Sequence, residues 1–353
     1  MTLRIPALLS VLALAAVLLA GCAAADTRPY LGAFEQNPEL RELFRLFSQE
    51  RDEENRFVLI QQIAANLANA GKKDREILFL TTHVERNPAD IFDAYYLSLV
   101  ADAYKEMKAI PFAIHYYRRI LKNHADLLVQ GRSVHLYCLQ ELISLETDPE
   151  NRIAYYKELI SRFSDQVEHL GSASYYMAKS YEELGEWEQA IQSYQKYLDY
   201  PDPEIPGVPN ASRLAAEKVL FFYSAKDWML PDLATLVAGV REAIATRNIT
   251  KLNRFKAKTN FFAEGWDQQA PSDETMAGEA AEFNIAGYLY SSNVHIGSDL
   301  APFSNDREAY LKTTDWNFRP PTWYLYFRKV DFPANPDVNG QWEWAGIYFG
   351  EKL

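Results

Sequence analysis

Cysteine is scarce in this chain of 353 residues, which contains only Cys22 and Cys138. The six histidines form no HExxH motif and pair with no cysteine at the spacing of a zinc site. Two cysteines also provide no disulfide framework of the kind that stabilises small secreted domains. We therefore expect no metal site, and we expect Cys138, which lies in an apolar stretch, to be a buried structural thiol.

Clustered basic charge is lacking as well. The formal net charge is -12, and the densest basic group is the pair Arg118 and Arg119 with Lys122 one turn later. Phosphate backbones are bound by clustered basic surfaces, so the sequence argues against nucleic acid as a partner.

Motifs of catalysis are also missing, since the chain has neither a glycine-rich phosphate loop nor a G-x-S-x-G elbow. Neighbouring acids such as Asp273 and Glu274 lie in a polar stretch, where carboxylates are usually solvated. The sequence predicts a protein without enzymatic activity, with no catalytic residues and no cofactor.

The amino-terminal segment carries the strongest local signal. Arg4 precedes an apolar run from Leu8 to Ala20, which is followed by Gly21 and Cys22. The stretch Leu19 to Cys22 resembles the lipobox of bacterial lipoproteins. That resemblance implies that residues 1–21 are a removed signal peptide and that Cys22 carries acyl chains such as palmitate. The alternative is a transmembrane anchor with a chance cysteine, but the run is shorter than the roughly 20 residues of a spanning helix.

A lipobox implies an envelope location. Ala23 follows the cysteine, and no aspartate stands there to retain the protein at the inner membrane, as it does in enterobacterial lipoproteins. The resemblance therefore favours the outer membrane, with the protein facing the periplasm. Residues 22–38 lack periodicity and are expected to form a tether between the lipid and the folded body.

Residues 39–200 show helical periodicity and an internal repeat. Ala101 and Ala178 are each followed by tyrosine three residues later and by alanine twelve residues later. Such small residues allow two helices of a hairpin to approach closely. These offsets resemble the tetratricopeptide repeat, with residues 171–204 as the best copy.

Three further units of the repeat are expected at residues 57–90, 94–127 and 133–166. The starts of the four units are 37, 39 and 38 residues apart, which is longer than the family's 34 and predicts lengthened turns between repeats. Lys108 replaces the turn glycine in the second unit, and Gln140 and Arg152 replace the small residues in the third. The alternative is an irregular helical bundle.

The resemblance implies that the first helix of each hairpin lines a concave groove, which binds other envelope proteins. Aromatic residues with mixed charge suit recognition of a protein surface. By position, the lining residues would be Tyr95, Asp102, Lys105, Tyr137, Glu141, Tyr175, Lys179 and Glu182. The alternative for each charged side chain is simple exposure to water.

A proline-rich connector with further helices is expected at residues 201–254, before an aromatic-rich α+β domain at residues 255–353. Strands are predicted at 283–290, 323–330 and 341–349, the last two as an antiparallel hairpin. Residues 240–252 loosely resemble the opening helices of SnoaL-like cone domains. The predicted fold class is mainly α, a tetratricopeptide-like solenoid followed by a smaller α+β domain with an antiparallel sheet.

Three functions follow from this organisation. The first is a lipid-anchored, non-catalytic scaffold that binds proteins through the repeat groove. The second is a lipoprotein that binds a solute or glycan in a carboxy-terminal aromatic pocket. The third is a cell-envelope hydrolase with carboxylates in the same domain. The candidate pocket residues are Trp266, Trp316, Trp323, Trp342 and Trp344, for which burial in the core is the alternative.

The lipobox interpretation predicts the effect of Cys22→Ala. Without the thiol, the precursor cannot receive its lipid, so an uncut or unlipidated form should accumulate and no mature form should appear. Electrophoretic mobility and membrane fractionation measure this. A variant that is still processed and membrane-bound would contradict the assignment of the anchor.

Overall fold

A computed structural model describes residues 37–352, except residues 168, 201–204, 206 and 267–282. The chain divides into two compact units, with the division between Ser164 and Asp165. Within the described ranges, no helix is both long and apolar enough to cross a membrane. The predicted signal peptide, Cys22 and nearly all of the tether lie outside the described residues. The predicted domain boundaries stay a prediction.

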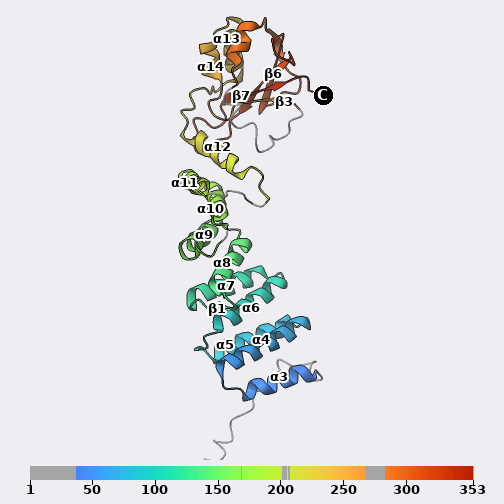
Figure 1. Ribbon diagram of the computed structural model, residues 1–353, viewed down its shortest axis with the longest axis vertical. Helices are drawn as coiled ribbons and strands as arrows, with labels where there is room; N and C mark the ends of the chain where they lie inside the picture. Colours follow the sequence, from blue (N-terminus) through green and yellow to red (C-terminus); the bar gives the residue numbers. More distant parts are fainter. Residues whose placement is uncertain (1–36, 168, 201–204, 206, 267–282, 353) are drawn as a thin grey trace, which may run out of the picture. The chain divides into compact units, whose positions relative to one another are not determined.

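The first unit consists of consecutive helices, each packed against the next (Figure 1). Its helices are α3 (Pro38–Gln49), α4 (Glu53–Asn69), α5 (Lys73–Arg86), α6 (Asp93–Glu106), α7 (Ile110–Asn123), α8 (Val134–Leu145) and α9 (Pro149–Phe163). The pairs α4–α5, α6–α7 and α8–α9 coincide with the three repeat units expected here. This arrangement fits a tetratricopeptide-like solenoid, as predicted.

Closely packed alanines hold the α6–α7 pair together. Ala101 on α6 and Ala113 on α7 are both 0% exposed. Tyr117, one turn after Ala113, is buried as well. A small side chain at the contact brings the two helix backbones close, and the larger ring fills the space beside them.

Three of the hairpins, α4–α5, α6–α7 and the α10–α11 pair of the second unit, have a residue with positive φ in the turn between their helices. Gly71 ends α4 with φ 70°, and Gly185 has φ 74° in a later hairpin of the second unit. Lys108 occupies the equivalent place after α6 with φ 62°. The left-handed turn is therefore preserved without glycine, although a side chain there costs about 1–2 kcal/mol.

A short antiparallel pair of strands accounts for part of the lengthened spacing. Strands β1 (Leu128–Val129) and β2 (Arg132–Ser133) form a tight hairpin between α7 and α8. Ser133 then caps α8, because its side chain accepts a hydrogen bond from the Leu136 amide. The extra residues thus lie between repeats, as the long spacing predicts.

The second unit combines a helical part with a mixed sheet. Its helices are α10 (Leu170–Leu184), α11 (Trp187–Leu198), α12 (Ala211–Tyr223), α13 (Leu233–Ala245), α14 (Ile249–Phe255) and α15 (Ile285–Ser291). Its strands are β3 (Phe262–Gly265), β4 (His295–Leu300), β5 (Glu308–Thr314), β6 (Trp323–Lys329) and β7 (Trp342–Phe349). The sheet order is β3-β7-β6-β5-β4, and only the β3–β7 pair is parallel.

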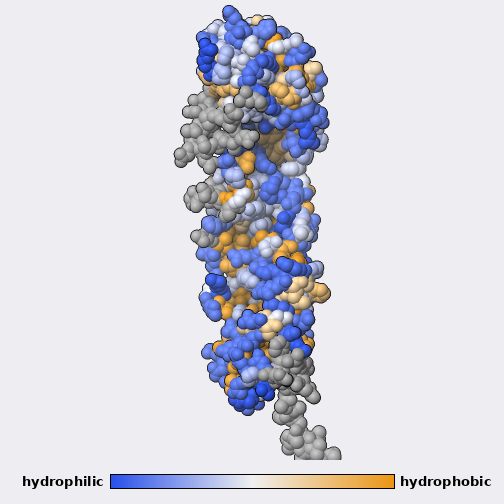
Figure 2. Space-filling model, turned by 90° about the vertical axis from the view of Figure 1, so that its right-hand side faces the viewer, coloured by the Kyte–Doolittle hydropathy of each residue, from blue (hydrophilic) through white to orange (hydrophobic). Residues whose placement is uncertain are grey.

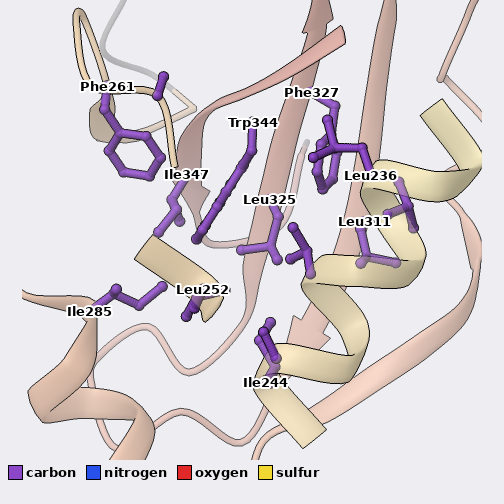
Figure 3. Packing of buried hydrophobic residues seen from close by; sticks show 14 of the residues in the cluster. Leu236, Ile244, Leu252, Phe261, Ile285, Leu311, Leu325, Phe327, Trp344 and Ile347 are labelled. Atoms are coloured by element: carbon purple, nitrogen blue, oxygen red, sulfur yellow. The ribbon is translucent and has the colours of Figure 1, made fainter. Parts of the chain in front are cut away.

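The β6–β7 hairpin confirms the predicted pairing of the last two strands. Trp323, Leu325 and Phe327 share one face of β6, as the alternation predicts, and all three are buried. Figure 3 shows Leu325 and Phe327 facing side chains of α13 and α14, including Leu236, Ile244 and Leu252. The main core of this unit therefore lies between the sheet and its helices.

One element was predicted wrongly, since most of the stretch predicted as a strand at residues 283–290 lies in the helix α15 (Ile285–Ser291) instead. The Asn284 side chain caps the helix by accepting from the Gly287 amide at 3.4 Å. Ile285 and Leu289 are buried, one helical turn apart. Aromatic residues gave this short stretch the composition of a strand, but its burial follows a period of four.

The alanine contact makes a testable prediction. Ala101→Leu should lower the free energy of unfolding of the first unit by about 1–3 kcal/mol, because the leucine overpacks the α6–α7 interface. Ala65→Leu is the matched control, since Ala65 is exposed on α4. Urea unfolding followed by circular dichroism measures both. Equal stability of the two variants would contradict close packing at Ala101.

Candidate functional site

A polar cluster joins the first helices of two successive hairpins, α6 and α8. Asp102 on α6 accepts hydrogen bonds from the hydroxyls of Tyr117 on α7 and Tyr137 on α8, each at 2.5 Å. Helices α6 and α8 are in direct contact. The family pattern, in which first helices lie side by side, is therefore present here.

An ion pair continues this cluster towards solvent. The Lys105 ammonium lies 2.7 Å from a carboxylate oxygen of Glu141 on α8 and 3.9 Å from Asp102. Lys105 and Glu141 are both partly exposed. The contact links α6 to α8 at the surface, where water still reaches both charges.

Tyr95 lies on the same face of α6, seven residues before Asp102. Its ring is half-buried and packs edge-on against Phe57 of α4, with the ring centroids 5.3 Å apart. Five predicted groove residues thus lie on α6 and α8. We name them the α6–α8 surface: Tyr95, Asp102, Lys105, Tyr137 and Glu141.

Burial controls the ionisation of this cluster. Desolvation raises the pKa of Asp102, and the hydrogen bonds from Tyr117 and Tyr137 oppose that rise. Cys138 lies next to the cluster and is fully buried. Desolvation also raises the pKa of its thiol, so Cys138 is the buried structural cysteine expected from the sequence.

The remaining predicted groove residues belong to the second unit. Tyr175 is only 8% exposed and packs against Tyr194 and Tyr197, so it lies in a core cluster. Lys179 and Lys218 both pair with Glu182, which joins α10 to α12. These ion pairs lower the pKa of Glu182, although desolvation opposes them.

Sequence reasoning missed two features of the first unit. Tyr117 lies on a second helix, yet its hydroxyl reaches Asp102. The exposed Phe112 stacks with Tyr104, and Tyr116 also stacks with Tyr104. On the face shown in Figure 2, hydrophobic residues are interspersed with hydrophilic ones over the helical part. The spacing of the aromatic residues along α7 is visible in the sequence. From it we predicted only the packing of the two helices, and neither of these two features.

The candidate tryptophans of the carboxy-terminal domain lie mainly in the core. Trp316, Trp323, Trp342 and Trp344 are buried between the sheet and its helices. Trp266 is partly buried in a second cluster on the opposite sheet face. In the described part of the chain, no three acidic, histidine or cysteine side chains gather as a metal site.

The family comparison agrees with this geometry. Residues 172–203 match the family model of the tetratricopeptide repeat. The match spans α10 and α11 and coincides with the stretch predicted as the best copy. No protein of curated function is significantly similar to the chain. The chain thus contains a tetratricopeptide repeat, a module that typically binds proteins and is generally non-catalytic.

Asp93, the first residue of α6, has a buried carboxyl. Asp93 is 2% exposed, and its Oδ1 has no hydrogen-bond partner among the described residues. Desolvation, with a smaller effect of the Asp90 charge, raises its pKa from 3.8 to about 7, against the attraction of Arg119. The folded protein therefore holds this proton more tightly than the unfolded chain does.

This proton contributes to the pH dependence of stability in the first unit. A folded-state pKa above the unfolded value means that stability is lost as the pH rises from about 4 to about 7. Asp93→Asn should remove this component and raise the free energy of unfolding at pH 8 by about 1 kcal/mol or more. Urea titrations between pH 4 and pH 8 measure it, with Glu85→Gln on the exposed side of α5 as control. An unchanged pH profile in Asp93→Asn would refute the assignment.

Proposed function

We propose that the protein is a non-catalytic adaptor that binds other proteins through the α6–α8 surface. The observation that carries the proposal is that five residues implied by the repeat pattern lie on two contacting first helices. Four of them, Asp102, Lys105, Tyr137 and Glu141, form one hydrogen-bonded and ion-paired cluster. A tetratricopeptide match elsewhere in the chain supports the same class of function.

The composition of the α6–α8 surface suits a protein partner. Tyrosine provides a large contact area with few rotatable bonds, together with a hydroxyl for hydrogen bonding. The Lys105–Glu141 pair is partly exposed, so either charge can exchange its partner for one on an incoming protein at low cost. Asp102 keeps Tyr137 oriented before binding, which reduces the side-chain entropy lost in the complex.

The location of the adaptor is part of the proposal. The lipobox-like stretch before Cys22 supports a lipid anchor in a bacterial envelope, with the outer membrane favoured and the body in the periplasm. The partners would then be other envelope proteins. At least two acyl chains on Cys22 would give firm attachment, because one chain alone binds membranes only marginally.

The two other functions have less support. A glycan or solute pocket built from tryptophans conflicts with the burial of Trp316, Trp323 and Trp344 in the core. A hydrolase would need two carboxylates facing each other across an open cleft. The loose resemblance of residues 240–252 to the opening helices of SnoaL-like cone domains stays a proposal about the fold.

Site-specific crosslinking in the native cell tests the adaptor proposal. A photo-reactive residue at position 141 should capture a defined partner, because Glu141 belongs to the α6–α8 surface and is partly exposed. The matched control is position 122, since Lys122 is exposed on the second helix α7. Lys105→Glu should lower the yield at position 141 by about tenfold, because it reverses one charge of the surface. Mass spectrometry of the product identifies the partner.

Two outcomes would overturn the proposal. Equal crosslinking at positions 141 and 122 would mean that contact is not specific to first helices. An unchanged yield in Lys105→Glu would mean that the cluster does not recognise the partner. The thermal transition of each variant shows that loss of crosslinking is not loss of folding.

A further inference from the structure

A cavity of about 570 Å³ lies within the second unit, and its lining includes none of the α6–α8 surface residues. It is bounded by α10 and α11 of the tetratricopeptide repeat, by α12, and by the segment that joins β6 to β7. Its size is within the range of roughly 300–1,000 Å³ that holds small organic ligands. The side chains of the surrounding helices and strands leave this space unfilled.

The cavity wall combines apolar and aromatic side chains with charged ones in similar proportion. Helices α11 and α12 and the β6–β7 segment each contribute to it. Its apolar members include Trp187, Ile191, Leu214, Phe221, Phe222 and Phe332. The Phe332 ring packs edge-on against Phe221, with the centroids 5.1 Å apart, which joins α12 to the sheet module. This apolar part of the wall can pack against the apolar body of a ligand, while the charged part can bind a polar group.

Most carboxylates at the cavity already have cationic partners. Glu182 is paired with Lys179 and Lys218, and Glu217 on α12 with Arg213. Glu343 is 1% exposed and accepts hydrogen bonds from the Trp228 ring nitrogen at 2.7 Å and from Arg328 Nε at 2.8 Å. Asp331 is exposed to water. The carboxylates that could bind a cationic ligand are therefore already paired with cations or hydrated by water.

Two cationic side chains at the same cavity, Arg328 and Lys329, have nitrogen atoms that can still bind an anion. Arg328 uses only its Nε towards Glu343, so its two terminal nitrogens have no partner among the described residues. The buried Glu343 fixes the orientation of that guanidinium. Lys329 has no carboxylate within ion-pair distance in the described chain and lies 5.9 Å from the Trp342 ring.

A further lysine already occupies the aromatic faces next to the cavity. The Lys226 ammonium lies 5.3 Å from the Phe221 ring and 5.0 Å from the Phe332 ring. It also donates to the carbonyls of Phe222 and Ser224. A second cation at these rings would be repelled, whereas an anion would be attracted.

We propose that this cavity binds a small amphiphile with an apolar body and one carboxylate, the body lying along the α11–α12 wall and the carboxylate at Arg328 and Lys329. The repeat next to α12 would then form part of a ligand site as well as a helical stack. This site uses none of the α6–α8 surface residues, so the two proposals stand or fall separately.

Calorimetric titration of the full chain with dodecanoate, below its micellar concentration, tests the ligand class. Dodecanoate should bind with one site per chain, and dodecyltrimethylammonium, which has the same apolar body with a cation, should bind at least about tenfold more weakly. Quenching or enhancement of tryptophan fluorescence supplies a second signal, because Trp187 lines the cavity. Equal binding of the two amphiphiles would overturn the choice of an anionic ligand.

A matched pair of variants tests the location. Leu214 lines the cavity and is 38% exposed, whereas Leu220 on the same helix is 60% exposed and does not line it. Leu214→Glu should weaken dodecanoate binding by about tenfold or more, because it places a charge against the apolar body, while Leu220→Glu leaves it unchanged. Equal affinity of the two variants would place binding elsewhere.

A second pair tests the head group. Lys329→Gln should weaken dodecanoate without weakening dodecanol, whereas the exposed Lys196→Gln on α11 should alter neither. Both lysines lie at the surface, so neither change requires the core to rearrange. Weaker binding of both ligands by Lys329→Gln would contradict a carboxylate at that lysine.

Discussion

The close packing of paired helices at buried alanines is the constraint that shapes two of the hairpins, α6–α7 and α10–α11. Ala101 and Ala113 in the first unit, and Ala178 and Ala190 in the second, are all buried. Only a small side chain allows antiparallel axes to come this near, and the tyrosines beside them then fill the remaining volume. A hairpin built this way cannot cover its own apolar sides, so each hairpin needs a neighbour.

The consequence for function is that first helices from different hairpins become neighbours. Asp102 and Tyr137 are 35 residues apart in sequence, yet they share a hydrogen bond. A half-buried carboxylate is costly unless it is hydrogen-bonded, and two tyrosine hydroxyls meet that need. The arrangement preorganises a surface of aromatic and charged groups, which is what a protein-binding face requires.

The sheet module uses aromatic residues in a different way. Both faces of β6 are buried, one among aliphatic side chains and tryptophans and the other among tyrosines. Gly346 on β7 leaves room for the Phe262 ring, since a Cβ there would lie 2.6 Å from that ring. Aromatic side chains that suggested a binding pocket therefore act mainly as packing. The cavity forms instead where α12 meets this module through Phe332.

The amino-acid sequence by itself determined the helical hairpins, their alanine contacts and the β6–β7 pairing, because each depends on spacing within a short stretch. It also predicted the groove residues, five of which lie on α6 and α8. Only the tertiary structure decided that Tyr117 shares Asp102 with Tyr137, that residues 285–291 are a helix, and that Tyr175 is core. Those outcomes depend on distant segments competing for the same space, and spacing along one segment carries no information about them.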